Sequence, residues 1–366
     1  MRMALVISTL GPGGAEHIMT MLANHLAGRG HHVDMITLDS PDNSPHYRLH
    51  QNVRLHPLGR MGTSSGPISA LFANMGRIRA LRKAFLKLHP DVILSFLTAT
   101  NILSLLAASG TEYPVVVAER ASLQQRLSGT PWILLRYITY PRAKAVVVQT
   151  QGEQKILHEL IPCTNKNSVV IPNPVARPTR TTTGHGIIFV GRFSEEKRPM
   201  DVLEAFALAR KQLKGRTLTM VGDGPLRQAV ESRVQALGLS QAVCFTGVIN
   251  SVDEQLIQND IFALSSAHEG FPNALCEAMA HGLACIATNS PGGCTDIMQH
   301  EHNGLLVPAG EIRHMADAMT RLATDDQLRT GVAANAMSIC EKFDNDHILC
   351  KWMQLLVETG ASACAV

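Results

Sequence analysis

The chain has 366 residues, of which 45 % are hydrophobic and 17 % are charged, so it carries enough apolar material to fill cores, which argues against a disordered protein. This length exceeds the size at which one hydrophobic core usually keeps growing, and we expect two domains. No apolar run approaches the roughly 20 residues that span a bilayer, so any membrane contact is expected to be peripheral.

The formal net charge of +3 is divided unevenly along the chain. Residues 1–178 hold 18 Lys and Arg against 9 Asp and Glu, a charge of +9, whereas residues 179–366 hold 15 against 21, a charge of −6. This asymmetry indicates that the first half faces something anionic, such as a phosphorylated ligand or an acidic membrane surface. Ordinary solvated surface is the alternative.

Short apolar runs rich in Val and Ile alternate with helix-length segments along the chain. In the first half they predict strands at 3–8, 34–38, 91–96, 115–118 and 145–149. After a polar, proline-rich stretch at 172–184, they predict strands at 186–190, 217–221, 243–246, 261–263 and 285–288. The alternation is typical of α/β architecture, with two doubly wound, Rossmann-like domains at 1–178 and 185–345. Because ligands bind beyond the carboxyl ends of such strands, we expect a cleft between facing domains, with loops from both halves.

Eight cysteines are scattered along the chain without a C-x-x-C pair, a pattern typical of reduced thiols in a cytosol. The even spacing of Cys276, Cys285 and Cys294 matches no ligand template, and buried small side chains are the better interpretation. No metal site is expected.

Two glycine-containing motifs follow expected strands in the second half. In the first, Gly191 permits close approach of a ligand. The planar guanidinium of Arg192 and the compact ammonium of Lys197 could together neutralise a leaving diphosphate without a divalent ion. In the second, Gly222 and Gly224 either bring the backbone close to a ligand or simply reverse the chain. Each motif alone is a weak signal, since basic residues and turns after strands are common.

The most specific motif places Glu269 and Glu277 on either side of an expected helix start, with Pro272 at the first helical position. Backbone N–H groups at the positive end of this helix would bind phosphate oxygens. The residues expected to line this donor pocket are Gly270, Phe271, Asn273, Ala274 and Leu275. Because carboxylates accept hydroxyl protons, Glu277 could hold ribose hydroxyls and Glu269 those of a transferred sugar, although surface glutamates on a helix are the alternative.

Together these motifs resemble the retaining GT-B glycosyltransferases of family 4. The resemblance rests on the E-x7-E pair, Gly191-Arg192 through Lys197, Gly222-Asp223-Gly224, and Gly13-Gly14-Ala15-Glu16 after the first strand. It covers essentially the whole chain, including a helical segment at 346–366 that in the family crosses back onto the first domain. The resemblance implies that Arg192 and Lys197 bind the donor diphosphate, that Glu269 contacts the donor sugar, and that Glu277 pairs with ribose. It thus implies that Arg192, Lys197 and Glu269 are the catalytic residues.

Two features of the first half belong to the same resemblance. Gly13 and Gly14 would let the backbone approach the donor diphosphate or the acceptor where a Cβ would collide, with a plain turn before a helix as the alternative. Glu119 and Arg120 fall where many relatives carry a Glu-His or similar pair lining the sugar pocket. At Arg120 a guanidinium, which only donates hydrogen bonds, stands where those relatives have an imidazole. Glu119 and Arg120 are both candidate acceptor-binding residues.

More narrowly, the segment with Ser95-Phe96-Leu97 and Thr100-Asn101 and the Gly-Gly-Ala-Glu loop resemble transferases that add N-acetylgalactosamine or similar hexoses to polyprenyl-diphosphate-linked glycans. Within 78–88, apolar side chains share one helical face and basic side chains the opposite one. The basic candidates for acceptor binding are Arg79, Arg82, Lys83 and Lys87. Related enzymes hold the acceptor's diphosphate with a basic helix here, and an anionic membrane surface would also attract it. A solvated outer face is the alternative.

The resemblance implies a retaining hexosyltransferase that acts on a lipid-linked glycan in surface polysaccharide, lipopolysaccharide or glycoprotein-glycan assembly, with UDP-GalNAc as the favoured donor. The departing diphosphate would take the acceptor's proton, so no side-chain base, metal or other cofactor is expected. The expected partners are a nucleotide-diphosphate sugar, a polyprenyl-diphosphate-linked glycan and an anionic membrane surface, but no nucleic acid. The expected location is the cytoplasm, at the cytoplasmic face of the inner membrane.

Three alternatives remain open. A nucleotide-sugar epimerase on the same fold would convert free donors without an acceptor. A non-catalytic nucleotide-sugar-binding protein would bind without transfer, but it would have no evident need for all of Arg192, Lys197, Glu269 and Glu277. A dinucleotide-dependent oxidoreductase is disfavoured, because Glu16 stands at the third glycine position of a G-x-G-x-x-G motif.

Overall fold

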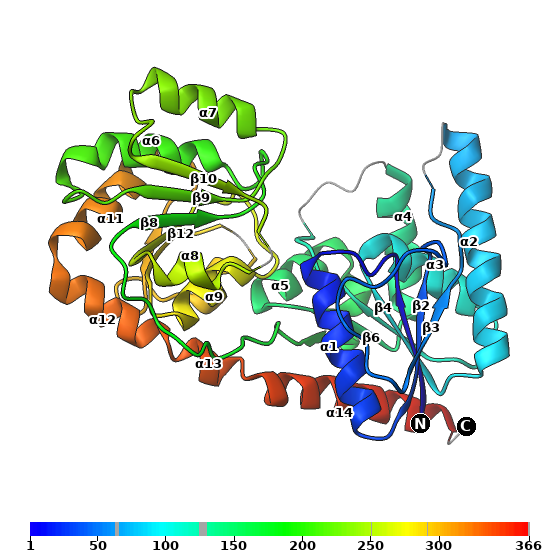
Figure 1. The fold of residues 1–366 in the computed structure, drawn as a ribbon. Coiled ribbons are helices and arrows are strands. Elements are labelled where there is room, and N and C mark those ends of the chain that lie inside the picture. Colours follow the sequence, from blue (N-terminus) through cyan, green and yellow to red (C-terminus); the bar gives the residue numbers. More distant parts are fainter. Residues whose placement is uncertain (63–65, 124–129, 250, 291, 365–366) are drawn as a thin grey trace. The chain divides into compact units, whose positions relative to one another are not determined.

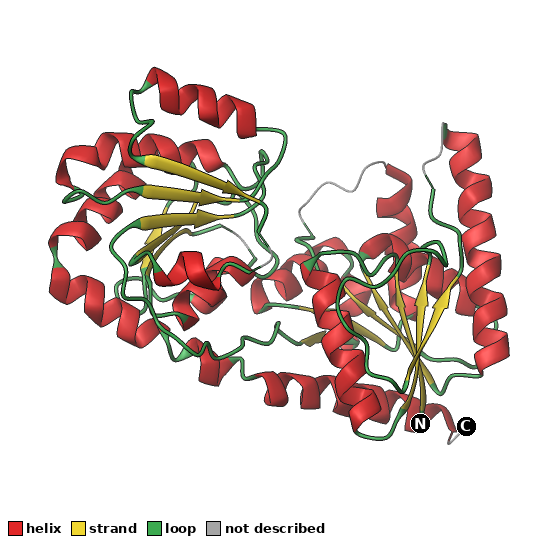
Figure 2. Ribbon diagram, in the orientation of Figure 1, coloured by secondary structure: helices red, strands yellow, loops and turns green. Residues whose placement is uncertain are grey.

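The computed structural model describes residues 1–62, 66–123, 130–249, 251–290 and 292–364. The chain forms two compact units, one comprising Met1–Pro174 with Asp346–Val366 and the other Val175–Asn345 (Figure 1). Each unit contains one parallel sheet with helices on both of its faces (Figure 2). The predicted α/β fold class, with two doubly wound units, is confirmed.

The sheet of the first unit has seven strands. In spatial order they are β3 (Val53–Pro57), β2 (His32–Thr37), β1 (Arg2–Ile7), β4 (Val92–Phe96), β5 (Val115–Ala118), β6 (Ala145–Val148) and β7 (Ser168–Val170). The helices of this unit are α1 (Gly14–Gly28), α2 (Pro67–Leu88), α3 (Thr98–Ala108), α4 (Thr130–Thr139), α5 (Gln151–Leu160) and α14 (Asn345–Cys364), with 3-10 turns η1 (Tyr140–Arg142) and η2 (Pro162–Lys166). The central strands read as continuous apolar runs because helices cover both faces of the sheet.

The sheet of the second unit repeats the same strand order. Its strands are β10 (Val243–Gly247), β9 (Leu218–Val221), β8 (Ile187–Val190), β11 (Ile261–Leu264), β12 (Ala284–Thr288) and β13 (Leu305–Val307). Its helices are α6 (Pro199–Ala209), α7 (Arg227–Ala236), α8 (Asp253–Ile257), α9 (Asn273–Ala280), α10 (Cys294–Ile297), α11 (Ile312–Thr324), α12 (Asp326–Ala336) and α13 (Ile339–Lys342), with the 3-10 turn η3 (Arg210–Gln212). In both sheets the direction of winding reverses beside the first strand, between β1 and β4 and between β8 and β11. Such a switch point is where doubly wound sheets bind ligands.

Three strands were not predicted, namely β3, β7 and β13, and all three lie at sheet edges. An edge strand is covered less completely than a central one and so needs fewer apolar residues. β3 carries Arg54 and His56, and its residues are only partly buried or exposed. The hydrophobic pattern that reveals central strands is therefore absent from β3.

The C-terminal helix α14 packs on the first unit. Its buried residues Ile348, Trp352 and Leu356 join the cluster that contains Leu5 of β1, and the Trp352 ring lies 5.6 Å from that of Phe96. α14 thereby fills the face of the first sheet that α1 also covers. None of the helices in the described residues is both long enough and apolar enough to cross a bilayer.

The cysteines whose side chains the structure describes are free thiols that differ in exposure. Cys163 of η2 and Cys244 of β10 are exposed, whereas Cys285 and Cys294 are buried in the second unit. Burial raises the pKa of the Cys285 thiol far above its usual range and that of the Cys294 thiol to about 12. The buried thiols are therefore protonated and unreactive.

Candidate functional site

The candidate residues of the second half gather at the carboxyl edge of the second sheet. The loop with Gly191, Arg192 and Lys197 follows β8, and the loop that contains Glu269 follows β11. Since β8 and β11 are neighbours at the switch point, the topology brings together two loops that are far apart in sequence.

Lys197 and Glu269 form an ion pair at this edge. Lys197 Nζ lies 2.6 Å from Glu269 Oε1, and the Ser266 hydroxyl donates a hydrogen bond of 2.7 Å to the same oxygen. The Glu269 side chain is 5 % exposed and that of Lys197 is 25 % exposed. The pair thus fixes the ammonium in place while leaving part of Lys197 open to a ligand.

A set of hydrogen bonds joins the two loops. The Ser265 hydroxyl lies within 2.8 Å of the Lys197 carbonyl and also contacts that of Arg198, and the Ala267 N–H donates to the Glu196 carbonyl at 2.8 Å. From β12, the Thr288 hydroxyl donates to the Ser266 carbonyl at 2.6 Å. These hydroxyl residues were missed in the sequence, although their place at the ends of neighbouring apolar strands is a usable signal.

Gly222 and Gly224 allow the loops after β8 and β9 to touch. Gly222 has φ +125° and a Cβ there would collide with the Gly191 carbonyl, while Gly224 has φ +156° and a Cβ would meet the Phe193 carbonyl. The Phe193 N–H donates in turn to the Asp223 carbonyl at 2.9 Å. Both glycines are thus required by backbone packing, whether or not a ligand approaches.

Arg192 differs from Lys197 in that it is exposed. Across the described residues, no hydrogen bond or ion pair engages its guanidinium. Its five N–H donors are available for an anion placed near Lys197.

α9 begins one residue later than predicted, so Pro272 precedes the helix instead of opening it. The Phe271 and Leu275 side chains point into the core, and the Phe271 ring packs edge-on against Phe343 with centroids 5.5 Å apart. Among the predicted donor-binding residues, these two can offer only backbone groups. Asn273 and Ala274 open the first turn of α9, and the Asn273 N–H donates to the Phe271 carbonyl at 3.0 Å.

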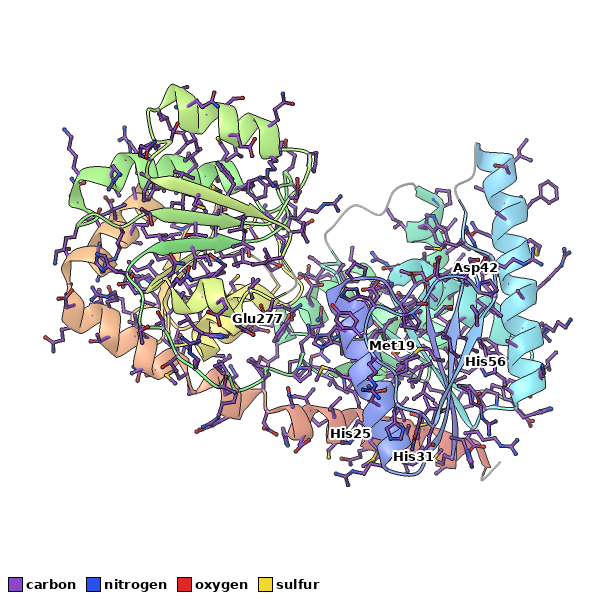
Figure 3. The ribbon with its side chains drawn as sticks, in the orientation of Figure 1. Met19, His25, His31, Asp42, His56 and Glu277 are labelled. Carbon is purple, nitrogen blue, oxygen red and sulfur yellow. The ribbon has the colours of Figure 1, made fainter. Side chains whose placement is uncertain are left out.

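Glu277 lies in the second turn of α9 (Figure 3). Its side chain is exposed, yet neighbouring protein crowds the carboxyl, and this desolvation raises the pKa of Glu277 to about 7. The Asp253 carboxylate raises the pKa of Glu277 further. Because water still reaches the side chain, desolvation is partial, and the carboxyl changes charge near neutral pH.

The loop after β12 contributes a position that sequence reasoning missed. A Cβ on Gly293 would lie 3.0 Å from the Glu269 carbonyl oxygen and 3.0 Å from Pro272 Cδ. Gly293 therefore lets this loop pack against the backbone that carries Glu269. Two consecutive glycines shortly after a predicted strand were the available signal.

Two candidate positions of the first unit lie at the start of α1. Gly13 precedes the helix with φ −170°, an extended conformation open to any residue, and a Cβ there would collide with the Glu16 carboxylate. Gly14 is the first residue of α1.

The candidate pair after β5 is buried in the first unit, where Glu119 is hydrogen-bonded but Arg120 Nε and Nη1 have no hydrogen-bond partner among the described residues. The Glu119 carboxylate accepts hydrogen bonds from the Thr98 hydroxyl at 2.7 Å and from the Tyr140 hydroxyl, and burial raises the pKa of Glu119. Arg120 donates to the Asn173 side chain, and its guanidinium lies 4.7 Å from the centre of the Phe96 ring. Burial removes water from the charged guanidinium, and this desolvation lowers the pKa of Arg120 to about 9.

The structure separates Arg82 from the other basic candidates on α2. Arg82 Nη1 donates to the carbonyls of Ala107 and Ser109 at 3.0 and 2.7 Å, and so caps the end of α3. Arg79, Lys83 and Lys87 are instead exposed and line a cavity of about 700 Å³ between α2 and β3.

Known proteins resemble this chain over nearly its whole length. Residues 12–177 match the model of Glycosyltransferase Family 4, and residues 177–338 match that of Glycosyl transferases group 1. A GalNAc-alpha-(1->4)-GalNAc-alpha-(1->3)-diNAcBac-PP-undecaprenol alpha-1,4-N-acetyl-D-galactosaminyltransferase from Campylobacter jejuni is 28 % identical, over 98 % of this chain and 99 % of its own. A second C. jejuni protein, an N-acetylgalactosamine-N,N'-diacetylbacillosaminyl-diphospho-undecaprenol 4-alpha-N-acetylgalactosaminyltransferase, is 22 % identical over 94 % and 96 % of the two chains.

Solved structures share the fold at low sequence identity. Sucrose-phosphate synthase from Thermosynechococcus elongatus superposes with a TM-score of 0.83 at 21 % identity, covering 99 % of this chain and 100 % of the other. Anabaena Alr3699/HepE in complex with UDP gives a TM-score of 0.80 at 18 % identity, covering 98 % and 100 %. These structures have the GT-B fold. The chain is therefore an enzyme of the GT-B glycosyltransferases, with a family 4 domain followed by a group 1 domain.

Proposed function

We propose that this glycosyltransferase transfers N-acetylgalactosamine, or a closely related hexose, from a uridine diphosphate sugar to a polyprenyl-diphosphate-linked glycan. The observation that carries the proposal is the Lys197–Glu269 pair at the switch point of the second sheet, with the unengaged Arg192 on the same loop. Support for the sugar and the acceptor comes from the names of the two C. jejuni relatives.

The proposed reaction retains the anomeric configuration. The bond from the anomeric carbon to the diphosphate oxygen breaks, the acceptor oxygen bonds to that carbon on the same face, and the acceptor's proton passes to the departing diphosphate. Arg192 and Lys197 stabilise the negative charge that develops on this diphosphate. They thereby provide the electrostatic stabilisation that a metal ion would otherwise provide. Glu269 orients Lys197 and accepts a sugar hydroxyl, and Glu277 accepts ribose hydroxyls.

The proposed acceptor site belongs to the first unit. In this proposal Arg79, Lys83 and Lys87 of α2 bind the acceptor's diphosphate. Ile68 and Phe72, near the start of the same helix, are 74 % and 72 % exposed. Exposed apolar side chains beside basic ones favour contact with an anionic membrane surface. We place this surface at the cytoplasmic face of the inner membrane.

A donor and acceptor panel tests the function. Purified protein is incubated with uridine and guanosine diphosphate sugars, with and without a polyprenyl-diphosphate-linked glycan and with a chelator present throughout. We expect acceptor-dependent release of UDP from UDP-GalNAc and a product heavier by one N-acetylhexosamine. Failure with every donor would falsify the transferase proposal, and loss of activity on chelation would refute metal independence. Nuclear magnetic resonance on the donor alone detects the alternative, an epimerase.

A further inference from the structure

Arg120 and Glu119 follow β5 at the carboxyl edge of the first sheet, where all its parallel strands end (Figure 2). Successive side chains of an extended segment point to opposite faces of a sheet. The Arg120 guanidinium lies over the ring of Phe96, which belongs to the apolar cluster shared with α1 and α14. The Glu119 carboxylate instead accepts a hydrogen bond from Tyr140, which belongs to the cluster on the other face. The neighbouring carboxylate therefore does not serve as the counter-ion of Arg120.

The Arg120 guanidinium lacks partners for most of its donors. Its Nη2 donates to the Asn173 side chain, but Nε and Nη1 are shielded from water and have no hydrogen-bond acceptor among the described residues. Nor does any carboxylate in that part of the chain form an ion pair with Arg120. Desolvation is the cause that lowers the pKa of this guanidinium to about 9. A cation held in this way is destabilised until an anion reaches it, because opposite charges attract strongly where water is excluded.

The missing anion is best matched by a single carboxylate. A diphosphate carries several negative charges and is matched by several cations, as at Arg192 and Lys197 of the second unit. Arg120 is one isolated cation, and desolvation, without a neighbouring charge, accounts for the shift of its pKa. A guanidinium and a carboxylate carry equal and opposite charges, are both planar, and pair through two parallel hydrogen bonds.

Resting on the proposed transfer to a lipid-linked glycan, we propose that Arg120 binds the carboxylate of an acidic sugar, a hexuronate, and selects it over the corresponding neutral hexose. Because the first unit is the proposed acceptor site, this sugar is the terminal sugar of the acceptor glycan. Arg120 as a whole is only half-buried, so rotation of its long side chain brings Nε and Nη1 to the ligand while the backbone stays in place. A neutral hexose leaves the cation unpaired, whereas the carboxylate compensates it.

Ligand titrations followed by nuclear magnetic resonance test this selection on the intact protein. Two pairs of ligands are compared, each differing only by a carboxylate in place of a hydroxymethyl group. One pair is methyl galacturonoside and methyl galactoside, added with UDP, and the other is UDP-galacturonate and UDP-galactose. We expect the wild type to bind the galacturonoside about tenfold more tightly than the galactoside, as for charge-assisted hydrogen bonds. Arg120→Met should bind both alike, and Arg120→Lys, which keeps the charge but not the planar fork, should keep part of the preference.

Thermal unfolding separates ligand binding from a structural role of Arg120. Arg120→Met replaces an uncompensated cation with a flexible apolar side chain against the Phe96 ring, so its melting temperature without ligand should exceed that of the wild type. The galacturonoside should raise the melting temperature of the wild type but not that of the variant. Arg142→Met, at an exposed position of η1, is the matched control and should change neither the binding preference nor the melting temperature.

A preference confined to the UDP-sugar pair would place the carboxylate on the transferred sugar and keep Arg120 as its ligand. Equal affinities within both pairs would overturn the proposal. A lower melting temperature for Arg120→Met would also overturn it, because Asn173 and Phe96 would then already satisfy the guanidinium. Since these titrations require no transfer, a protein that prefers the galacturonoside but transfers no sugar would refute the proposed function and leave the Arg120 site standing. Transfer of N-acetylhexosamine without this preference would refute the Arg120 site alone.

Discussion

The Lys197 ammonium has two roles, because it neutralises the buried Glu269 carboxylate and faces the proposed diphosphate. Glu269 lies 72 residues further along the chain, so no local pattern in the sequence reports their contact. The sequence indicated that both residues follow strands. The contact itself requires the strand order, which places β8 beside β11.

Replacing Lys197 with Ala should lower turnover about 100- to 1,000-fold, because one strong electrostatic contact to the leaving group is lost. Release of UDP under saturating substrates measures this effect. The fold should survive, since the Ser266 hydroxyl still donates to Glu269. Lys211→Ala, at an exposed position of η3, is the control, and near-normal turnover of Lys197→Ala would remove Lys197 from the mechanism.

Glu277 should make donor binding depend on pH. With a pKa of about 7, its carboxyl is neutral at pH 6 and ionised at pH 8, and only the ionised form accepts two ribose hydroxyl protons well. The KM for the donor should therefore fall as the pH rises from 6 to 8. Steady-state kinetics on Glu277→Gln should lose this trend, and an unchanged profile would exclude Glu277 as its source.

The same raised pKa affects stability. The folded protein holds a proton on Glu277 that the unfolded chain has already released, so this group lowers stability as the pH rises from about 4.5 to about 7. Glu277→Gln should consequently gain stability relative to the wild type at pH 8 but not at pH 4. Urea denaturation at both pH values measures the difference, and a gain confined to pH 4 would contradict the assignment.

At the scale of elements, the central strands were predictable, whereas the edge strands β3, β7 and β13 were not. β5 consists of Val115, Val116, Val117 and Ala118, and its burial on both faces demands such a run. β3 alternates apolar residues with Arg54 and His56, because one of its sides pairs with no strand. The basic residues of α2 were noticed because they share one face of a helical pattern, whereas β3 gave no strand signal.

The contact between the loops that follow β8 and β9 predicts how glycine substitutions change the stability of the fold. Gly222→Ala should cost about 2 kcal/mol or more, because it places a Cβ at φ +125° and against the Gly191 carbonyl. Gly331→Ala is the control, since this glycine lies within α12 with open space around it, and it should instead gain about 0.5 to 1 kcal/mol. Urea denaturation compares the two variants, and equal stabilities would contradict the packing argument.

For the whole molecule, α14 makes the stability of the first unit depend on the last residues of the chain. Trp352 is fully buried in the cluster that contains β1, so Trp352→Ala should cost about 3 to 5 kcal/mol. Thermal unfolding followed by circular dichroism should show the transition of the first unit moving to lower temperature. Lys351→Ala, exposed on the same helix, should change stability by less than about 0.5 kcal/mol. A wild-type-like transition in Trp352→Ala would mean that α14 contributes little.

The distribution of thiols has a practical consequence for the whole molecule. Cys163 belongs to the first unit and Cys244 to the second, both are exposed, and the buried Cys285 and Cys294 resist alkylation. A variant without Cys350 and Cys364 would accept one spin label on each unit at natural positions. The distance between the two labels, recorded with and without UDP, would report directly whether the donor nucleotide draws the units together.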